Sequence, residues 1–261
     1  MNSSPNIRFH NLKKKAHDAF EKTGYEISRK HETRIIPKDM EADTHDVIHQ
    51  VMPFTQTSYE RLYALQKTID YLVENDIAGA IVEAGVWKGG SAMAALMRLV
   101  SHDATDREIW LYDTYEGMPP PTEYDVSDTE GDAADLFEAE RTGLVSTDWN
   151  AAGLAEVKRN IATTGYPEDR IRYVEGLVER TLKSAVPDEI ALLRLDTDFY
   201  ESTKVELEVL YERVVTGGVV LIDDYGTWKG ARKAVDDFLE TCQPKPLLVR
   251  LDWSCRLIIK P

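Results

Sequence analysis

The chain has 261 residues and a formal net charge of -15, and 43% of its residues are apolar and 30% charged. This length is enough to bury a core, and so acidic a surface repels phosphate backbones and anionic lipids, so we expect neither nucleic-acid nor membrane binding. The two cysteines, Cys242 and Cys255, do not have the spacing of a zinc site or a CxxC pair. With neither a signal-like N-terminus nor an apolar run long enough to span a membrane, a cytoplasmic location is the default expectation.

The N-terminal part of the chain is polar. Residues 1–50 are only weakly periodic, although 10–27 have the spacing of a short amphipathic helix, and we expect an extension that serves as a lid or an oligomer contact. A clear helix follows over 57–76, with a capping box from Thr57 to Glu60. The apolar stripe of this helix consists of Leu62, Leu65, Ile69 and Leu72.

From residue 80 onward, strand and helix signals alternate. Apolar strands that alternate with helices are typical of a parallel sheet covered on both faces. The sequence therefore predicts an α/β fold with a doubly wound, mostly parallel sheet in one domain over 51–261. The expected strands are 80–85, 108–113, 171–176, 190–196 and 217–224, with a closing hairpin of 246–252 and 255–261, and the helices are 89–100, 154–165, 202–214 and 229–242.

One segment interrupts this alternation. Residues 118–150 contain three consecutive prolines and eight acidic residues between Glu123 and Glu140. A connection of this length inside a compact domain is usually functional or disordered. We interpret it as an acidic, lid-like insertion over a ligand; the alternative is a floppy insertion.

The carboxyl ends of the first three strands have the residues of a nucleoside site. Ligands of open α/β sheets bind beyond these ends. Gly85, Gly89 and Gly90 allow a tight turn and a close approach to a ligand. Asp113 ends the second strand, where it can accept hydrogen bonds from both ribose hydroxyls, and Gly176 follows the third, where a flat base can approach. Together they predict a cofactor that contains adenosine.

The loop sequence favours one such cofactor. Its glycines are spaced G-x-x-x-G-G rather than G-x-G-x-x-G, and Glu83 lies at its start. A carboxylate at this position favours a cationic ligand such as S-adenosylmethionine, and it would repel the pyrophosphate of a dinucleotide. The alternative is an ordinary glycine-rich turn with a capping glutamate.

The fourth and fifth strands both end in acids, namely Asp196 and Asp198 in the first case and Asp223 and Asp224 in the second. Successive strands tend to be neighbours, so these carboxylates should meet, and they would repel one another unless a proton or a cation joined them. An all-oxygen group indicates a hard cation, Mg²⁺ or otherwise Mn²⁺ or Ca²⁺. The alternatives are a helix cap at Asp198 and ion pairs with Arg194 or Lys204.

In this order and spacing, the motifs "VEAGVWKGGS", "LYDTYEGMP", "LRLDTDFYEST", "LYERVVTGGVVLIDDYG" and "ARKAVDDF" resemble the macrocin O-methyltransferase family over residues 54–242. The resemblance implies a class I methyltransferase Rossmann-like fold, S-adenosylmethionine, Mg²⁺ or Mn²⁺, and methylation of a sugar hydroxyl on a natural product. It also implies a homo-oligomer, a dimer or higher.

The resemblance assigns roles by motif. It implies that Asp196, Asp223 and Asp224 hold the metal and that Asp198, or Asp196 itself, takes the proton. One departure is Thr197, where the compared members have glycine, and it bears on the acceptor, which could instead be a polysaccharide sugar. The implied cofactor contacts are Glu83, Ala84, Gly85, Gly89, Gly90, Ser91, Asp113 and Gly176.

Three other readings of the sequence compete with this one. A catechol-type O-methyltransferase also uses Mg²⁺ and a diol. An NAD-dependent dehydrogenase or epimerase fits Asp113 but neither the glycine spacing nor Glu83. A non-catalytic scaffold does not explain four clustered acids.

Overall fold

The computed structural model describes residues 39–144 and 146–261. Met40–Pro261 form one compact unit. The helix expected over 10–27 lies outside the described residues. Among those described, no helix has the length and apolar character needed to cross a membrane.

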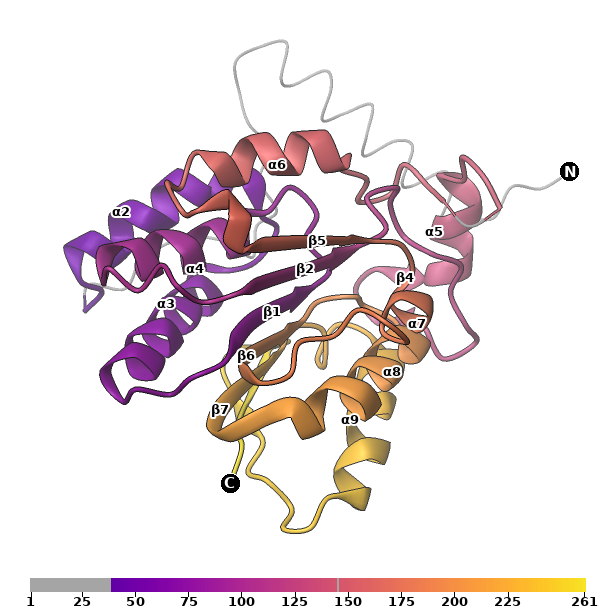
Figure 1. Cartoon of the computed structure of the whole chain (residues 1–261). Coiled ribbons are helices and arrows are strands. Elements are labelled where there is room, and N and C mark those ends of the chain that lie inside the picture. The colour runs from indigo at the N-terminus through magenta and orange to yellow at the C-terminus, as the bar shows by residue number, and fades with distance from the viewer. Residues whose placement is uncertain (1–38, 145) are drawn as a thin grey trace, which may run out of the picture. The chain divides into compact units, whose positions relative to one another are not determined.

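The compact unit is built on a seven-stranded sheet in the order β5-β2-β1-β6-β7-β9-β8 (Figure 1). The first five strands in this order are parallel, and the last two close the sheet as an antiparallel hairpin. This confirms the predicted doubly wound, mostly parallel sheet. The strands are β1 Ala80–Ala84, β2 Ile109–Asp113, β5 Ile171–Glu175, β6 Ile190–Leu195, β7 Val214–Ile222, β8 Val249–Arg250 and β9 Arg256–Ile259.

Helices cover both faces of the sheet, and this explains why the central strands read as continuous apolar runs. Every residue of β1 and β6 is buried. Alternate residues face opposite sides, so Ile81 and Leu192 belong to one core cluster, whereas Val82 and Leu193 belong to the other. The main helices are α2 Ala42–Val51, α3 Tyr59–Glu74, α4 Gly90–Ser101, α6 Leu154–Ala162, α7 Val178–Thr181, α8 Tyr200–Leu210 and α9 Lys229–Thr241, with short 3₁₀ turns η1 Met52–Phe54, η2 Glu168–Arg170 and η3 Tyr211–Arg213.

The N-terminal helices differ in detail from the prediction. Helix α2 begins at Ala42 and packs against α4 with Ile48 and Val51 fully buried, so residues 42–50 belong to the compact unit although the sequence placed its start at 51. The cap of α3 is Ser58, one residue later than predicted, and its Oγ accepts from Arg61 N at 3.3 Å. The hydroxyl of Thr57 donates instead to Asp223, at 3.4 Å.

The described part of the acidic insertion is folded and packs against the starts of helices α8 and α9. It contains a two-stranded ladder of β3 Val126–Ser127 and β4 Gly131–Asp132, followed by helix α5, Ala133–Ala139. Asp125 is fully buried, and its Oδ1 accepts from Tyr200 N at 2.7 Å, at the start of α8. The described part of the insertion is therefore not a floppy loop, and its role as a lid stays a prediction.

A second contact joins the insertion to the acid strands. The Trp149 ring lies 5.8 Å from the Phe199 ring and 6.0 Å from the Trp228 ring, between ring centroids. Phe199 directly follows Asp198, and Trp228 N donates to the carbonyl of Asp224. An aromatic cluster thus borders the strand ends that carry the acids.

Candidate active site

The loop after β1 lies directly against the end of β6. Gly85 has φ +83°, and a Cβ there would lie 1.9 Å from the carbonyl oxygen of Asp196. The N–H of Asp196 donates to the carbonyl of Ala84 at 2.8 Å. Only glycine allows this approach, and it places the expected cofactor loop beside the first acid of the expected metal site.

Asp113 holds this loop in place. Its Oδ2 accepts from the N–H groups of Val86 at 2.7 Å and Trp87 at 3.0 Å, and its Oδ1 accepts from Tyr115 N at 2.8 Å. Gly176 N donates to the backbone carbonyl of Asp113 at 2.9 Å. The ends of β1, β2 and β5 therefore meet as expected, while contact of Asp113 with a ribose stays a prediction.

The start of α4 completes the loop. Gly89 is the N-cap with φ +89° and provides no side-chain cap. A Cβ on Gly90 would lie 2.6 Å from the carbonyl oxygen of Phe54, which precedes α3. Ser91 is buried with 4% exposure. The first backbone N–H groups of this helix thus present the positive end of its dipole beside the loop.

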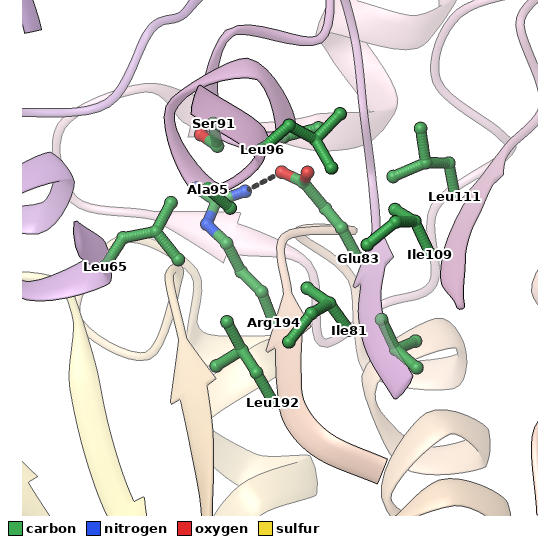
Figure 2. Close-up of a pocket in the computed structure, with 12 residues that line it drawn as sticks. Leu65, Ile81, Glu83, Ser91, Ala95, Leu96, Ile109, Leu111, Leu192 and Arg194 are labelled. Carbon is green, nitrogen blue, oxygen red and sulfur yellow. Dashed lines mark hydrogen bonds and ion pairs between the residues drawn. The ribbon is translucent and has the colours of Figure 1, made fainter. Parts of the chain in front are cut away.

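Glu83 has a partner that the sequence did not assign to it. Its Oε1 lies 2.6 Å from Nη1 of Arg194 (Figure 2). The carboxylate is 5% exposed, and burial raises its pKa to about 7 although Arg194 opposes the shift. Both residues line a pocket between the sheet and helices α3 and α4. Because the carboxylate is turned toward this pocket, its contact with the cofactor stays a prediction.

Arg194 also reaches the acids. Its Nη1 lies 2.7 Å from Asp196 Oδ2, which is the ion pair that the sequence left open as an alternative, and its Nη2 bonds to Asp223. Asp223 is 1% exposed and receives a second guanidinium, that of Arg61. The Nε of Arg61 lies 2.7 Å from Asp252 Oδ2. Two arginines and four acids thus form one ion-pair network behind the strand ends.

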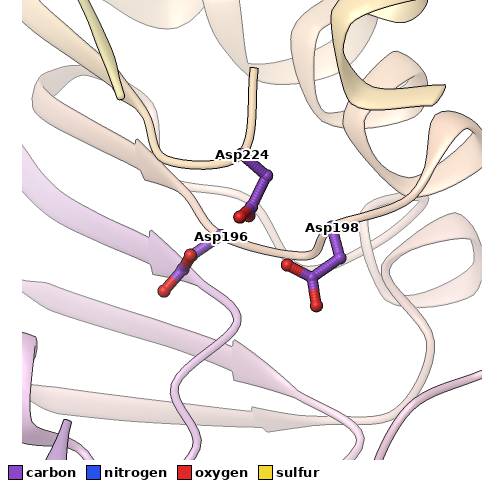
Figure 3. A group of neighbouring side chains, drawn as sticks. All are labelled: Asp196, Asp198 and Asp224. Carbon is purple, nitrogen blue, oxygen red and sulfur yellow. The ribbon is translucent and has the colours of Figure 1, made fainter. Parts of the chain in front are cut away.

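Three carboxylates gather at the mouth of this network. One oxygen from each of Asp196, Asp198 and Asp224 lies within 4.8 Å of the others (Figure 3). Burial, together with the neighbouring acids, raises the pKa of Asp198 to about 7 and those of Asp196 and Asp224 well above the usual range. The Oδ2 of Asp224 is buried and has no hydrogen-bond partner among the described residues.

The backbone aims Asp198 into the group. Its φ is +67°, and Phe199 N donates to the carbonyl of Thr197 at 2.7 Å, which is the pattern of a γ-turn with positive φ. This conformation is rare outside glycine and costs energy, and such strain is concentrated at functional sites. The turn agrees with the role expected for Asp198, which stays a prediction.

The structure changes the set of grouped acids. Asp196 and Asp224 lie together as the resemblance implied, whereas Asp223 faces Arg61 and Arg194, and Asp198 takes its place in the group. The sequence did not identify Arg61 as part of the site. Arg194 could have been recognised, because it is a charged residue inside an apolar run and such a residue needs a buried ion-pair partner. The sequence could not say which carboxylates are its partners.

Thr197 turns away from the acids between which it stands. Its Oγ1 donates to the carboxylate of Glu206 on α8, at 3.0 Å and 3.1 Å from the two oxygens. Glu206 is fully buried, and burial raises its pKa well above the usual range. This hydrogen bond connects the turn that carries Asp196 and Asp198 to helix α8. The helical periodicity of the sequence does not predict the bond.

Comparison with known proteins identifies the family. Residues 5–259 match the family described as macrocin-O-methyltransferase (TylF). The chain is 33% identical over 186 residues to demethyldecarbamoylnovobiocin O-methyltransferase of Streptomyces niveus, covering 70% of this chain and 67% of the relative. It is 30% identical over 199 residues to mycinamicin III 3''-O-methyltransferase of Micromonospora griseorubida, covering 76% and 75%.

A solved structure agrees. The O-methyltransferase NovP superposes with a TM-score of 0.70 at 28% identity, covering 79% of this chain and 82% of that one. The calicheamicin methyltransferase CalS11 shares the fold, with a TM-score of 0.59 at 18% identity and coverage of 90% and 99%.

The fold and the loop at its ligand edge are those of a class I, S-adenosylmethionine-dependent O-methyltransferase. Within this class, the chain belongs to the macrocin-O-methyltransferase family.

Proposed function

We propose that the protein transfers the methyl group of S-adenosylmethionine to a hydroxyl of a sugar on a glycosylated natural product or a polysaccharide, with a divalent cation at Asp196, Asp198 and Asp224. The observation that carries the proposal is this group of three carboxylates beside the loop after β1. The relatives support the acceptor class. One is the mycinamicin enzyme, and another, from Streptomyces olivaceus and 34% identical over 184 residues, is named as a 4'-O-methyltransferase of a rhamnosyl-tetracenomycin.

The residues fit a cation of the Mg²⁺ type. All three side chains offer oxygen, the donor that Mg²⁺ and Mn²⁺ prefer. The raised pKa values of the three acids mean that burial and mutual repulsion oppose their ionisation. One oxygen of Asp224 is buried and has no hydrogen-bond partner among the described residues, so it is open to a ligand. A bound cation would offset the repulsion and lower the pKa of a nearby sugar hydroxyl.

The cofactor fits the loop between β1 and α4. The N-terminus of α4, with Gly89 and Gly90, offers backbone N–H groups and a positive dipole to the cofactor's carboxylate. The methyl donor then lies beside the acids, because Gly85 places this loop against Asp196. Both carboxylate oxygens of Asp113 already accept hydrogen bonds from three backbone N–H groups. Only their remaining lone pairs could accept hydrogen bonds from the ribose hydroxyls.

In the reaction, the chain has to orient the acceptor oxygen and take its proton. Asp198 is the proposed base, because its turn with positive φ aims its carboxylate into the group of acids, where the acceptor hydroxyl would lie. Arg194 holds Asp196 by its 2.7 Å ion pair, so the two acids of the turn have different partners. Alignment of oxygen, methyl and sulfur then supplies much of the rate.

The test is methylation of an acceptor panel with added Mg²⁺, with EDTA, and with EDTA followed by excess Mg²⁺. The panel contains glycosides of the kinds named for the relatives, free sugars and catechols. We expect transfer to a glycoside that EDTA abolishes and Mg²⁺ restores. Full activity in EDTA would refute the requirement for a cation. Transfer to catechols alone would show that the acceptor is a catechol and not a sugar.

A further inference from the structure

The loop between β8 and β9 carries an exposed tryptophan to the ligand edge of the sheet. Strand β9 runs antiparallel to β7, and Arg256 pairs with Ile222. The residues before β9 therefore lie at the edge where β7 ends in Asp223. Trp253 in this loop is 56% exposed, one of the few large apolar side chains on the described surface.

The backbone that carries Trp253 is fixed to the site. Oδ1 of Asp252 accepts from the N–H groups of Ser254 at 2.8 Å and Cys255 at 2.6 Å. The hydroxyl of Ser254 donates to the carbonyl of Asp223 at 2.8 Å. A Cβ on Gly226 would lie 2.1 Å from the carbonyl oxygen of Trp253, so only glycine lets the two loops meet. Little conformational entropy is lost when a group held in this way binds a ligand.

The indole also contacts the ion-pair network. The guanidinium of Arg61 lies 5.7 Å from the centroid of the Trp253 ring and bonds to Asp223 and Asp252. Because two carboxylates already neutralise Arg61, this part of the site does not call for a charged ligand. What remains accessible is the flat apolar surface of the indole beside Arg61.

We propose that Trp253 is an acceptor-binding residue, whose indole stacks against a sugar ring of the glycoside. This rests on the proposed function and adds a contact to it. A pyranose has an apolar face of C–H groups and a polar rim, so it matches an indole that lies beside carboxylates. The contact would hold the sugar with a hydroxyl toward Asp198.

The experiment compares Trp253→Ala and Trp253→Phe with the wild type, using the glycoside that the wild type methylates fastest in the panel. We expect Trp253→Ala to raise KM for the glycoside about tenfold and Trp253→Phe to raise it less, with KM for S-adenosylmethionine unchanged. Leu247→Ala is the matched control, because Leu247 is 77% exposed just before β8. This control should change neither constant.

The outcomes separate the two proposals. An unchanged KM for the glycoside in Trp253→Ala, or an equal rise for both substrates, would overturn the role of Trp253 while wild-type turnover still supports the function. A wild type that methylates no glycoside would overturn the proposed function and the inference with it. Thermal unfolding of each variant checks the fold; if Trp253→Ala is destabilised, Trp253→Phe carries the test.

Discussion

Thr197 Oγ1 lies 3.0 Å from Glu206 Oε1, so the hydroxyl of the residue between the two acids of the turn is bound to helix α8. A buried carboxyl left without its partner is costly, and we expect Thr197→Val to lower stability by about 1–3 kcal/mol. The strained turn should also shift, and turnover should fall. Urea unfolding and kcat measure both effects.

Thr197→Ser is the control, because it keeps the hydroxyl. It should stay near the wild type in both measurements. Equal behaviour of the valine and serine variants would show that the contact with Glu206 has no energetic role.

Neutralising Asp223 and neutralising Asp198 should change the stability of the fold in opposite directions. Asp223→Asn leaves Arg61 and Arg194 each short of a buried carboxylate, and breaking such pairs costs about 3–5 kcal/mol. Asp198→Asn removes one of three mutually repelling carboxylates and should keep or raise stability without added metal. Thermal unfolding in EDTA tests this order.

The same two variants test the cation site by Mg²⁺ titration followed by calorimetry. Asp198→Asn should lose most of its affinity, and any Asp223→Asn protein that folds should lose less. The reverse order of affinities would return Asp223 to the set of ligands that the family resemblance implied.

A methyl group on Gly85 should disrupt the site. The new Cβ would lie 1.9 Å from a backbone oxygen of Asp196, so either the loop or β6 has to move. Gly165 has a similar φ, +77°, but a Cβ there would have no neighbouring atom within 4 Å, so Gly165→Ala bears only the conformational cost of about 1 kcal/mol. Gly85→Ala should be far less stable and inactive. Similar losses of unfolding free energy in the two variants would contradict the close approach.

A distant ion-pair cluster predicts a pH dependence of stability. Asp70 lies 2.9 Å from Arg98 Nη2 and 2.8 Å from His102 Nε2. Burial raises the pKa of Asp70, but bonds from Arg98, His102 and Lys67 outweigh it and lower the pKa from 3.8 to about 2. A depressed pKa stabilises the fold above pH 3.8, and this contribution is lost as the pH falls toward 2.

Asp70→Asn should therefore cost about 2 kcal/mol at neutral pH. The difference from the wild type should shrink below pH 4, as urea unfolding at pH 7, 5 and 3 would reveal. A difference that stays constant with pH would mean that the charge of Asp70 contributes nothing.

Much of the fold was predictable because its signals are local. Apolar runs such as 190–195 and helical spacing such as that of α3 reflect which faces are buried, and both were found close to their observed bounds. The cap at Ser58 was missed by one residue because Thr57 fits the same cap pattern and the competing bond to Asp223 comes from distant sequence.

The sequence alone determined that glycines and acids stand at the carboxyl ends of consecutive strands, and these motifs were enough to indicate the family. The tertiary structure decided where each acid points. Asp223 is bound by Arg61, 162 positions away, and Asp198 enters the group through a turn with positive φ. A shift of one residue, or a change in one dihedral angle, turns a side chain at a strand end to another direction. The arginines that neutralise these acids come near them only in the folded sheet.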